Sequence, residues 1–126
     1  MLPKRHRLKH SAEIRRVYRQ GQRRHHPLLT LYAARAATGA AAQPSRFAVS
    51  INRRVGNAVV RNRGKRLVRE AIRAHLEAIE PGWDCLFVAR SGLAGATYVE
   101  VEAAVCRVLD QAALLTPGAG PLAHPK

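Results

Sequence analysis

Basic side chains crowd the start of one predicted helix, in the segment 55–70. Backbone N–H groups without partners give a helix N-terminus about half a positive charge, so each cation there costs about a few tenths of a kcal/mol. No acid lies among residues 55–69 to offset that cost. Phosphate suits both a helix N-terminus and a guanidinium fork. We therefore predict that this helix binds a polyanion through its early cations, Arg61, Arg63, Lys65 and Arg66.

A helical projection separates the basic and apolar residues of this segment. At about 100° per residue, one arc of about 140° is polar and basic, and an arc of about 120° on the other side is apolar. The polar arc holds Arg61, Asn62, Lys65, Arg66, Arg69 and Arg73. Asn62 could read a base edge or bind a phosphate, although simple solvation of this face is the plainer alternative. Gly64 lies on the apolar arc, where we expect it to permit close approach to the sheet.

Side chains for hydrolytic chemistry are not grouped along the chain. Two-metal phosphodiester hydrolysis needs clustered carboxylates, and the basic half offers only Glu13. The six histidines show no metal-ligand spacing, and Ser91 has no local base signature. Cys85 and Cys106 stand alone in apolar surroundings, so we predict reduced core residues. We expect no catalytic and no metal-ligating side chains in this protein.

The two halves of the 126-residue chain differ sharply in charge. Residues 1–69 hold 18 of the 22 Lys and Arg and only one of the 8 acids. This asymmetry predicts a basic half that faces nucleic acid or an anionic membrane surface, on a single domain. No segment approaches the roughly 20 apolar residues that span a bilayer, and no apolar core of a signal peptide follows the basic N-terminus. We therefore expect a cytoplasmic protein without a membrane segment.

The elements that position these residues follow from hydrophobic periodicity. Helices are predicted over residues 12–19, from about 58 to 79, and over 97–115; Ser11 and Asn57 are expected to cap the first two, and Gly21 to end the first. Strands are predicted over residues 28–35, 46–53 and 83–89, the last buried on both faces, with two or three strands between the first two helices. Residues 38–45 have the composition of a loop. This order predicts helices packed on a sheet.

Residues 55–70 resemble the signature of the bacterial ribonuclease P protein subunit, whose hallmark is Arg-Asn-Arg followed by Lys-Arg. The matching residues are Arg61-Asn62-Arg63 and Lys65-Arg66. The similarity continues in the family's order from about residue 7 to 113, through Arg7-Leu8-Lys9, residues 17–21, Leu31-Tyr32, residues 46–55 and residues 84–90.

The resemblance implies an α/β (α+β) two-layer sandwich, αβββαβα, with a left-handed βαβ crossover, ribosomal protein S5 domain 2-like. Residues 1–115 would form one domain, with residues 1–10 as a basic N-terminal arm. Residues 116–126, rich in Pro and Gly, would form a disordered tail.

The resemblance also implies a 1:1 ribonucleoprotein whose catalytic centre lies in the RNA subunit, with Mg²⁺. The protein would bind that RNA and hold the 5′ leader of precursor tRNA in a cleft between the sheet and the first helix. The implied contacts to the RNA subunit are Arg53, Arg54, Arg61, Arg63, Lys65, Arg66 and Arg69. The implied leader cleft comprises Ile14, Tyr18, Tyr32, Arg61 and Asn62. Ile14 replaces the family's usual aromatic residue, and Gly64 replaces a usual aliphatic one.

Other interpretations remain at this level. Tyr18 and Tyr32 flank the basic helix and could stack on unpaired bases, but each, taken alone, is more often a core residue. A ribosomal or other structural RNA-binding protein would fit the same charge asymmetry and would need no leader cleft. A sequence-specific DNA binder would need a helix-turn-helix pair, and the strand predicted before Gly56 argues against it.

Overall fold

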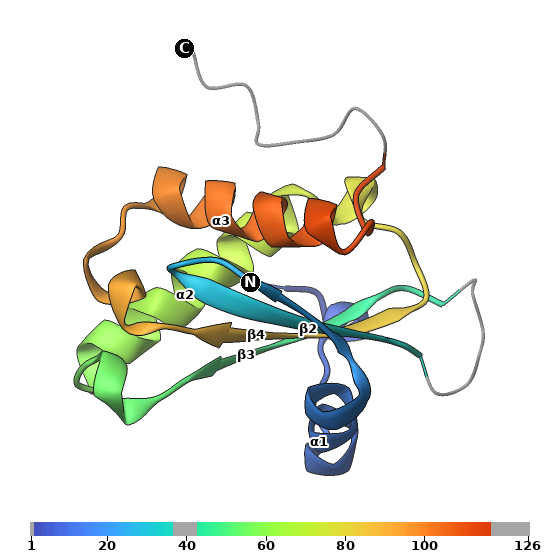
Figure 1. Ribbon diagram of the computed structural model, residues 1–126, viewed down its shortest axis with the longest axis horizontal. Coiled ribbons are helices and arrows are strands. Elements are labelled where there is room, and N and C mark those ends of the chain that lie inside the picture. Colours follow the sequence, from blue (N-terminus) through green and yellow to red (C-terminus); the bar gives the residue numbers. More distant parts are fainter. Residues whose placement is uncertain (1, 37–42, 117–126) are drawn as a thin grey trace.

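A mixed four-stranded sheet forms the middle of the molecule, which a computed structural model describes over residues 2–36 and 43–116 (Figure 1). The main elements are α1 (Ser11–Gln20), β1 (Gln22–His25), β2 (Leu29–Arg35), β3 (Arg46–Ile51), α2 (Ala58–Ala74), β4 (Trp83–Ala89) and α3 (Tyr98–Gln111). Short 3₁₀ turns are η1 (Lys4–His6), η2 (Arg53–Val55), η3 (Leu76–Ala78) and η4 (Ser91–Gly95). The order αβββαβα is the predicted one.

The strands lie in the order β1-β2-β4-β3. β2 pairs antiparallel with both β1 and β4, whereas β3 and β4 are parallel and are connected through α2. Figure 1 shows α2 and α3 on one face of the sheet and α1 on the other. The predicted α+β sandwich is confirmed. Since only one helix covers the second face, part of that face stays open beside it.

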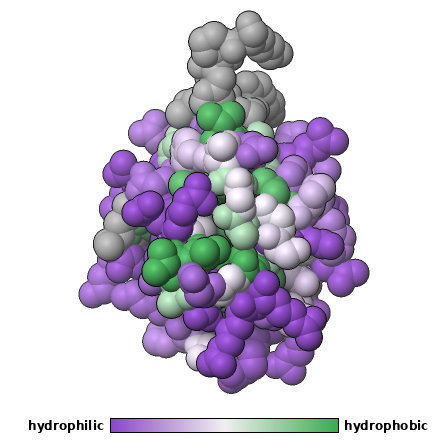
Figure 2. Space-filling view, turned by 90° about the vertical axis from the view of Figure 1, so that its left-hand side faces the viewer, coloured by the Kyte–Doolittle hydropathy of each residue, from purple (hydrophilic) through white to green (hydrophobic). Residues whose placement is uncertain are grey.

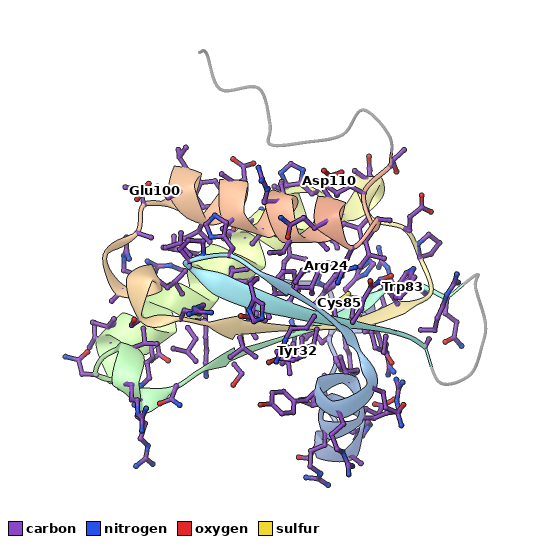
Figure 3. The ribbon with its side chains drawn as sticks, viewed as in Figure 1. Arg24, Tyr32, Trp83, Cys85, Glu100 and Asp110 are labelled. Carbon is purple, nitrogen blue, oxygen red and sulfur yellow. The ribbon has the colours of Figure 1, made fainter. Side chains whose placement is uncertain are left out.

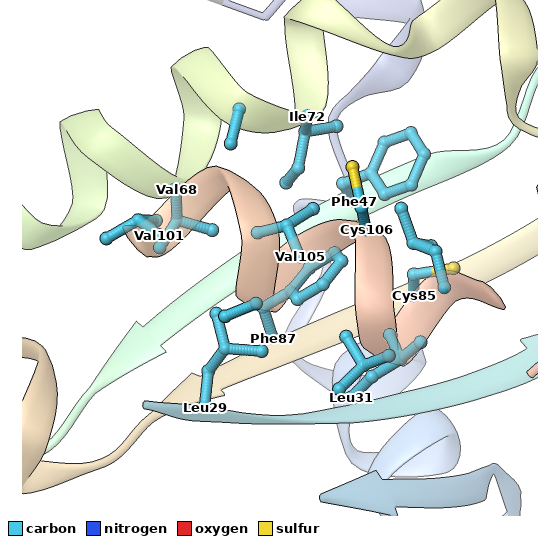
Figure 4. Close-up of a cluster of buried hydrophobic side chains, with 14 of the residues drawn as sticks. Leu29, Leu31, Phe47, Val68, Ile72, Cys85, Phe87, Val101, Val105 and Cys106 are labelled. Carbon is cyan, nitrogen blue, oxygen red and sulfur yellow. The ribbon is translucent and has the colours of Figure 1, made fainter. Parts of the chain in front are cut away.

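Alternating residues of the strands supply two separate cores. Leu31, Phe47, Cys85 and Phe87 point toward α2 and α3 and belong to the larger core (Figure 4). Leu86, on the opposite face of β4, joins a smaller core beneath α1 with Leu8, Val17 and Ala34. The prediction that this strand is buried on both faces is therefore confirmed.

Both cysteines are buried and free, as predicted. Burial raises the pKa of the Cys106 thiol to about 11 and raises that of the Cys85 thiol further still. Thiols that stay protonated are poor nucleophiles, so these two serve as apolar core residues.

One of the two predicted helix caps is confirmed and the other is wrong. The Asn57 side chain accepts a hydrogen bond from the Val60 N–H at 3.0 Å, as predicted, and Thr97 forms a capping box with Glu100. The prediction that Ser11 caps α1 is wrong, because Ser11 is already helical and the preceding His10 makes no side-chain cap. The first bond of α1 runs from the Ile14 N–H to the His10 carbonyl.

Two helices end earlier than predicted. α2 ends at Ala74 and continues as the tighter η3 instead of running to residue 79. α3 ends at Gln111 because the chain turns at Ala113, whose φ is +60°. Residues 117–126, the predicted disordered tail apart from Thr116, lie outside the described residues, as do residues 37–42 of the predicted loop.

Two glycines mark close approaches of backbone to neighbouring elements. A Cβ at Gly64 would lie 2.9 Å from the Ile51 Cδ1 atom and 3.0 Å from Leu93 Cδ2, which confirms the predicted close packing of α2 on the sheet. A Cβ at Gly21 would lie 2.6 Å from the Val17 carbonyl oxygen and 3.0 Å from the Ala33 nitrogen of β2. Gly21 therefore lets the chain leave α1, whose end was predicted here, and pass directly against the sheet.

Candidate RNA interface

A cleft of about 580 Å³ runs between α1 and the face of the sheet formed by β3 and β4. Its lining comprises Ile14, Arg15, Tyr18 and Arg19 from α1, and Ser50, Leu86 and Val88 from the strands. Val17 of α1 is fully buried in the smaller core, so this side of the helix faces the sheet. The residues of α1 that flank Val17 on the helix surface border the cleft. We call this opening the α1 cleft.

The floor and the wall of the α1 cleft differ chemically. Leu86 and Val88 give an apolar floor on β4, while Arg15 and Arg19 stand one helical turn apart on α1 and are exposed. An apolar floor accommodates flat bases, and guanidinium groups bind phosphates. This combination suits a single nucleic-acid strand better than a small neutral ligand.

Two tyrosines meet beside this cleft. The ring centroids of Tyr18 and Tyr32 are 4.8 Å apart with the planes inclined at 39°. Tyr18 is 56% exposed and lines the cleft, whereas Tyr32 is half-buried on β2, beneath the sheet and next to α1 (Figure 3). Tyr32 thus supports the ring of Tyr18 and leaves much of that ring available for stacking.

A second hollow, of about 310 Å³, adjoins the first at the edge strand β3. Ile14 lines both hollows, and Arg7, Lys9 and Arg69 border the second one. Residues 7–8 pair with β3 through a bridge from Arg7 to Phe47, so the N-terminal segment is held against the sheet edge. The basic helix α2 and the α1 cleft are connected through this hollow.

An ion-pair network holds α1 over the sheet. Asp84 on β4 is 1% exposed, and its carboxylate accepts hydrogen bonds from Arg16 of α1 at 2.8 Å and from Arg46 of β3 at 2.9 and 3.0 Å. Arg46 also binds Glu13 of α1 at 2.7 Å. The Asp84 carboxylate and Arg46 of β3 therefore fix the position of α1, which forms the wall of the cleft.

The basic face of α2 is largely open to solvent. Asn62, Arg66, Arg69 and Arg73 are exposed, while Arg61 and Lys65 are half-buried. The Nε of Arg61 is buried and has no hydrogen-bond partner among the described residues. Arg53 and Arg54 are exposed in η2, directly before α2. These residues extend from the start of α2 along its open face.

Arg63 does not lie with the other predicted RNA contacts. Its Nη2 donates a hydrogen bond to the Ala96 carbonyl at 3.0 Å and so ties α2 to the segment before α3. The end of the molecule where α2 and α3 begin also carries apolar side chains within a hydrophilic rim (Figure 2). Val59 and Val99, at 77% and 52% exposure, belong to these two helix starts. Arg63 thus contacts the segment before α3 and lies apart from the other basic residues of α2.

Sequence reasoning predicted Ile14 and Tyr18, which line the α1 cleft, and Tyr32, which contacts Tyr18. It also placed Arg61 and Asn62 in the cleft, but neither is among the residues that line it. It missed Arg15, Arg19, Ser50, Leu86 and Val88, which also line the cleft. The i, i+4 spacing of Arg15 and Arg19 around Val17 was the signal that could have identified the wall.

Metal-binding groups do not gather in the parts of the chain that the structure describes. Within residues 2–36 and 43–116, no set of three or more His, Cys, Asp or Glu side chains could hold a metal ion. No helix in these ranges is both long and apolar enough to cross a bilayer.

Comparisons with known proteins agree with this geometry. The family model described as "Ribonuclease P" matches residues 2–113. The ribonuclease P protein component of Herpetosiphon aurantiacus is 41% identical over 108 residues, which cover 86% of this chain and 85% of the relative. The corresponding protein of Clostridium novyi is 37% identical over 113 residues, covering 90% of this chain and 98% of the relative.

Solved structures share the fold. The RNase P protein of Staphylococcus aureus has a TM-score of 0.79 and 26% sequence identity, with 90% of this chain and all of that chain covered. The RNase P protein of Thermotoga maritima, at 21% identity and a TM-score of 0.73, covers 83% of this chain and 96% of its own and is similar in fold. The sequence match and the shared architecture together establish that this chain belongs to the ribonuclease P protein family.

Proposed function

We propose that this protein binds the RNA subunit of ribonuclease P through α2 and η2, and the 5′ leader of precursor tRNA in the α1 cleft. As a ribonuclease P protein component, it takes part in removing the 5′ leader from precursor tRNA, which gives the mature tRNA 5′ end. The observation that carries the leader assignment is the α1 cleft, with an apolar floor, an arginine wall and an exposed, supported tyrosine.

The cleft suits an unpaired strand. Bases of a single strand can stack on the exposed ring of Tyr18, which contributes about 1–3 kcal/mol per base in single-strand binding proteins. Arg15 and Arg19 are placed to bind the phosphates that follow along the backbone. Ile14 offers apolar contact without a ring, so one stacking position of the family is absent here. Grip on the leader would depend on its length more than on its sequence.

The open face of α2 suits the larger RNA. Its exposed arginines, Arg66 and Arg69 among them, can bind phosphates bidentately. The second hollow, bordered by Arg69, Arg7 and Lys9, connects this face with the cleft. A single chain can therefore hold the RNA subunit and the leader of the substrate at the same time.

Chemistry would reside in the RNA subunit, with Mg²⁺ bound there. In this proposal the side chains of the protein bind and orient RNA, neutralise phosphate charge and hold no metal. They would lower the Mg²⁺ concentration that the RNA needs, because cations of the protein replace part of the counterion atmosphere. The complex would be a 1:1 ribonucleoprotein in the cytoplasm.

Reconstitution tests the function. The protein is mixed with a bacterial ribonuclease P RNA and a precursor tRNA at a Mg²⁺ concentration where the RNA alone cleaves slowly. We expect the mixture to release the leader efficiently and the purified protein alone to release none. Cleavage by RNA-free protein, or no stimulation of the RNA, would contradict the proposed division of labour.

The alternative of a general structural RNA-binding protein uses the same basic face. It needs no α1 cleft, so it predicts equal affinity for mature tRNA and for precursors with any leader. Affinity that rises with leader length distinguishes the two functions.

A further inference from the structure

A separate cationic hollow lies across the sheet from the α1 cleft, between the turn joining β1 to β2 and helix α3. Its volume is about 370 Å³, and no acidic residue lines it. The lining comprises His25, His26, Pro27, Ala103, Arg107 and Gln111. β1 is the edge strand opposite β3, and α3 covers the face of the sheet that α1 does not (Figure 3). The two hollows therefore share no residue and open on different sides of the molecule.

The ring of His26 is held in one orientation. Its Nδ1 accepts a hydrogen bond from the Leu28 N–H at 3.0 Å, while its own backbone N–H donates to the Leu29 carbonyl at 2.9 Å. A backbone N–H can only donate, so Nδ1 is the acceptor and the neutral ring carries its proton on Nε2. Burial and the nearby Arg107 guanidinium lower the pKa of His26, which favours this neutral form. The ring thus keeps an N–H donor on Nε2.

Arg107 is exposed and has no hydrogen-bond or ion-pair partner within residues 2–36 and 43–116. Asp110, one turn further along α3, forms no ion pair with it. Arg107 lines the same hollow as His26, from the α3 side. A free cation therefore stands beside a fixed neutral donor.

The end of α3 does not require Arg107. Arg24 donates from Nε to the Gln111 carbonyl at 3.1 Å, and the Gln22 side chain donates to the Ala112 carbonyl at 3.4 Å. The remaining bonds of Arg24 go to the Arg23 carbonyl and the Gln22 side chain, so this guanidinium is fully engaged. Backbone N–H groups of residues 112–114 satisfy the preceding carbonyls of α3, so the charge of Arg107 is left for an external anion.

We propose that this hollow, the His26–Arg107 pocket, binds a phosphate group of an RNA strand. The guanidinium of Arg107 and the Nε2–H of His26 donate to the phosphate oxygens, and the Gln111 amide is a third donor on the same rim. The choice of RNA rests on the proposed function, whereas the phosphate chemistry rests on the pocket alone. The protein would then hold RNA on both sides of its sheet.

Phosphate binding is tested first without RNA. Inorganic phosphate is titrated into the full-length ¹⁵N-labelled protein while amide and arginine side-chain resonances are followed. We expect saturable shifts at His26, Arg107 and Gln111, and about five-fold weaker binding for Arg107→Ala, the loss of one charge-assisted contact. Arg5→Ala removes the same charge from an exposed residue of η1 and should leave the titration unchanged. Unsaturable shifts, or equal binding by Arg107→Ala, would overturn the pocket.

The source of the phosphate is tested with the assembled complex. Arg107→Ala should lower the log–log salt slope of assembly with ribonuclease P RNA and precursor tRNA by somewhat under one unit. In Arg107→Ala, affinity should still depend on leader length. The cleft variant Tyr18→Ala should lose this dependence but should bind inorganic phosphate as the wild type does. Phosphate binding with an unchanged salt slope would overturn the assignment to RNA and leave free phosphate as the ligand. If the affinity of the wild-type complex does not depend on leader length, the proposed function is contradicted, but the His26–Arg107 pocket is not.

Discussion

Arg46 and Asp84 are register partners across the parallel β3–β4 pair, and the arginine donates two hydrogen bonds to the carboxylate, at 3.0 and 2.9 Å. The same carboxylate receives Arg16 of α1. Asp84 is 1% exposed, so a single buried carboxylate links α1 to β3 and β4. These contacts hold α1 against the sheet and thereby shape the α1 cleft.

Asp84→Ala should be strongly destabilising. It leaves Arg16 and Arg46 without their shared acceptor, and hydrogen bonds to charged groups contribute about 1.5–3 kcal/mol each. We expect a loss of about 2–4 kcal/mol in the free energy of unfolding by urea denaturation, because both arginines keep some access to water. Glu13→Gln, at the solvent side of the network, should cost at most about 1 kcal/mol. Equal costs for the two substitutions would contradict the central place of Asp84.

The Glu13 contact also predicts a pH dependence. The hydrogen bond from Arg46 holds the pKa of Glu13 below its ordinary value. A carboxyl whose pKa is lower in the folded state stabilises the fold above its unfolded pKa of about 4.3, and this contribution is lost as pH falls through the folded value. Glu13→Gln should therefore make stability fall less steeply below about pH 4 than in the wild type. Identical acid limbs in the two denaturation series would show that this ion pair does not persist in solution.

Gly64→Ala has two opposite effects on the stability of the fold. Alanine gains about 1 kcal/mol of helix propensity, but its Cβ would press on Ile51 and the buried Leu93 at 2.9 and 3.0 Å. Overpacking of this kind costs about 1–3 kcal/mol, so we expect net destabilisation of about 1 kcal/mol. In the double variant with Ile51→Val, shortening the facing side chain should recover part of the loss. A double-mutant cycle without coupling would mean that the helix shifts freely away from the sheet.

Arg61 and Arg66 should contribute to the salt dependence of RNA binding. Replacing each by Ala should reduce the log–log salt slope by somewhat under one unit per lost phosphate contact. Arg63→Ala is the matched control on the same helix, because its guanidinium binds the Ala96 carbonyl. We expect Arg63→Ala to lower thermal stability with little change in slope. Reversed effects would place the RNA on the other side of α2.

Ile14→Phe tests the missing stacking position. Ile14 is half-buried and lines both hollows, so a ring there can reach leader bases. A gain near the low end of about 1–3 kcal/mol per stacked base would appear as several-fold tighter binding, for long leaders only. If the ring instead turns into the core beneath α1, melting temperature should fall without a leader-dependent gain, because overpacking costs about 1–3 kcal/mol.

The sequence was sufficient for the fold and for part of the site. The alternation in β3, the nearly continuous apolar run of β4 and the cap at Asn57 are local signals, and the structure agrees with them. Ser11 failed as a cap because α1 begins one residue earlier than predicted, so that Ser11 is itself helical. Arg63 appeared equivalent to its neighbours until the position of Ala96 was known. The His26–Arg107 pocket joins elements about 80 residues apart, so no local pattern could predict it.

Affinity for precursor tRNAs of increasing leader length, measured with the reconstituted ribonucleoprotein, tests the central role of the α1 cleft. We predict that affinity rises as the leader lengthens to fill the cleft and then levels off. Tyr18→Ala should remove most of that rise, and Tyr18→Phe, which keeps the ring, should retain it. Tyr18 is 56% exposed, so both variants should fold. Affinity independent of leader length in the wild type, or an undiminished rise in Tyr18→Ala, would contradict leader binding in this cleft.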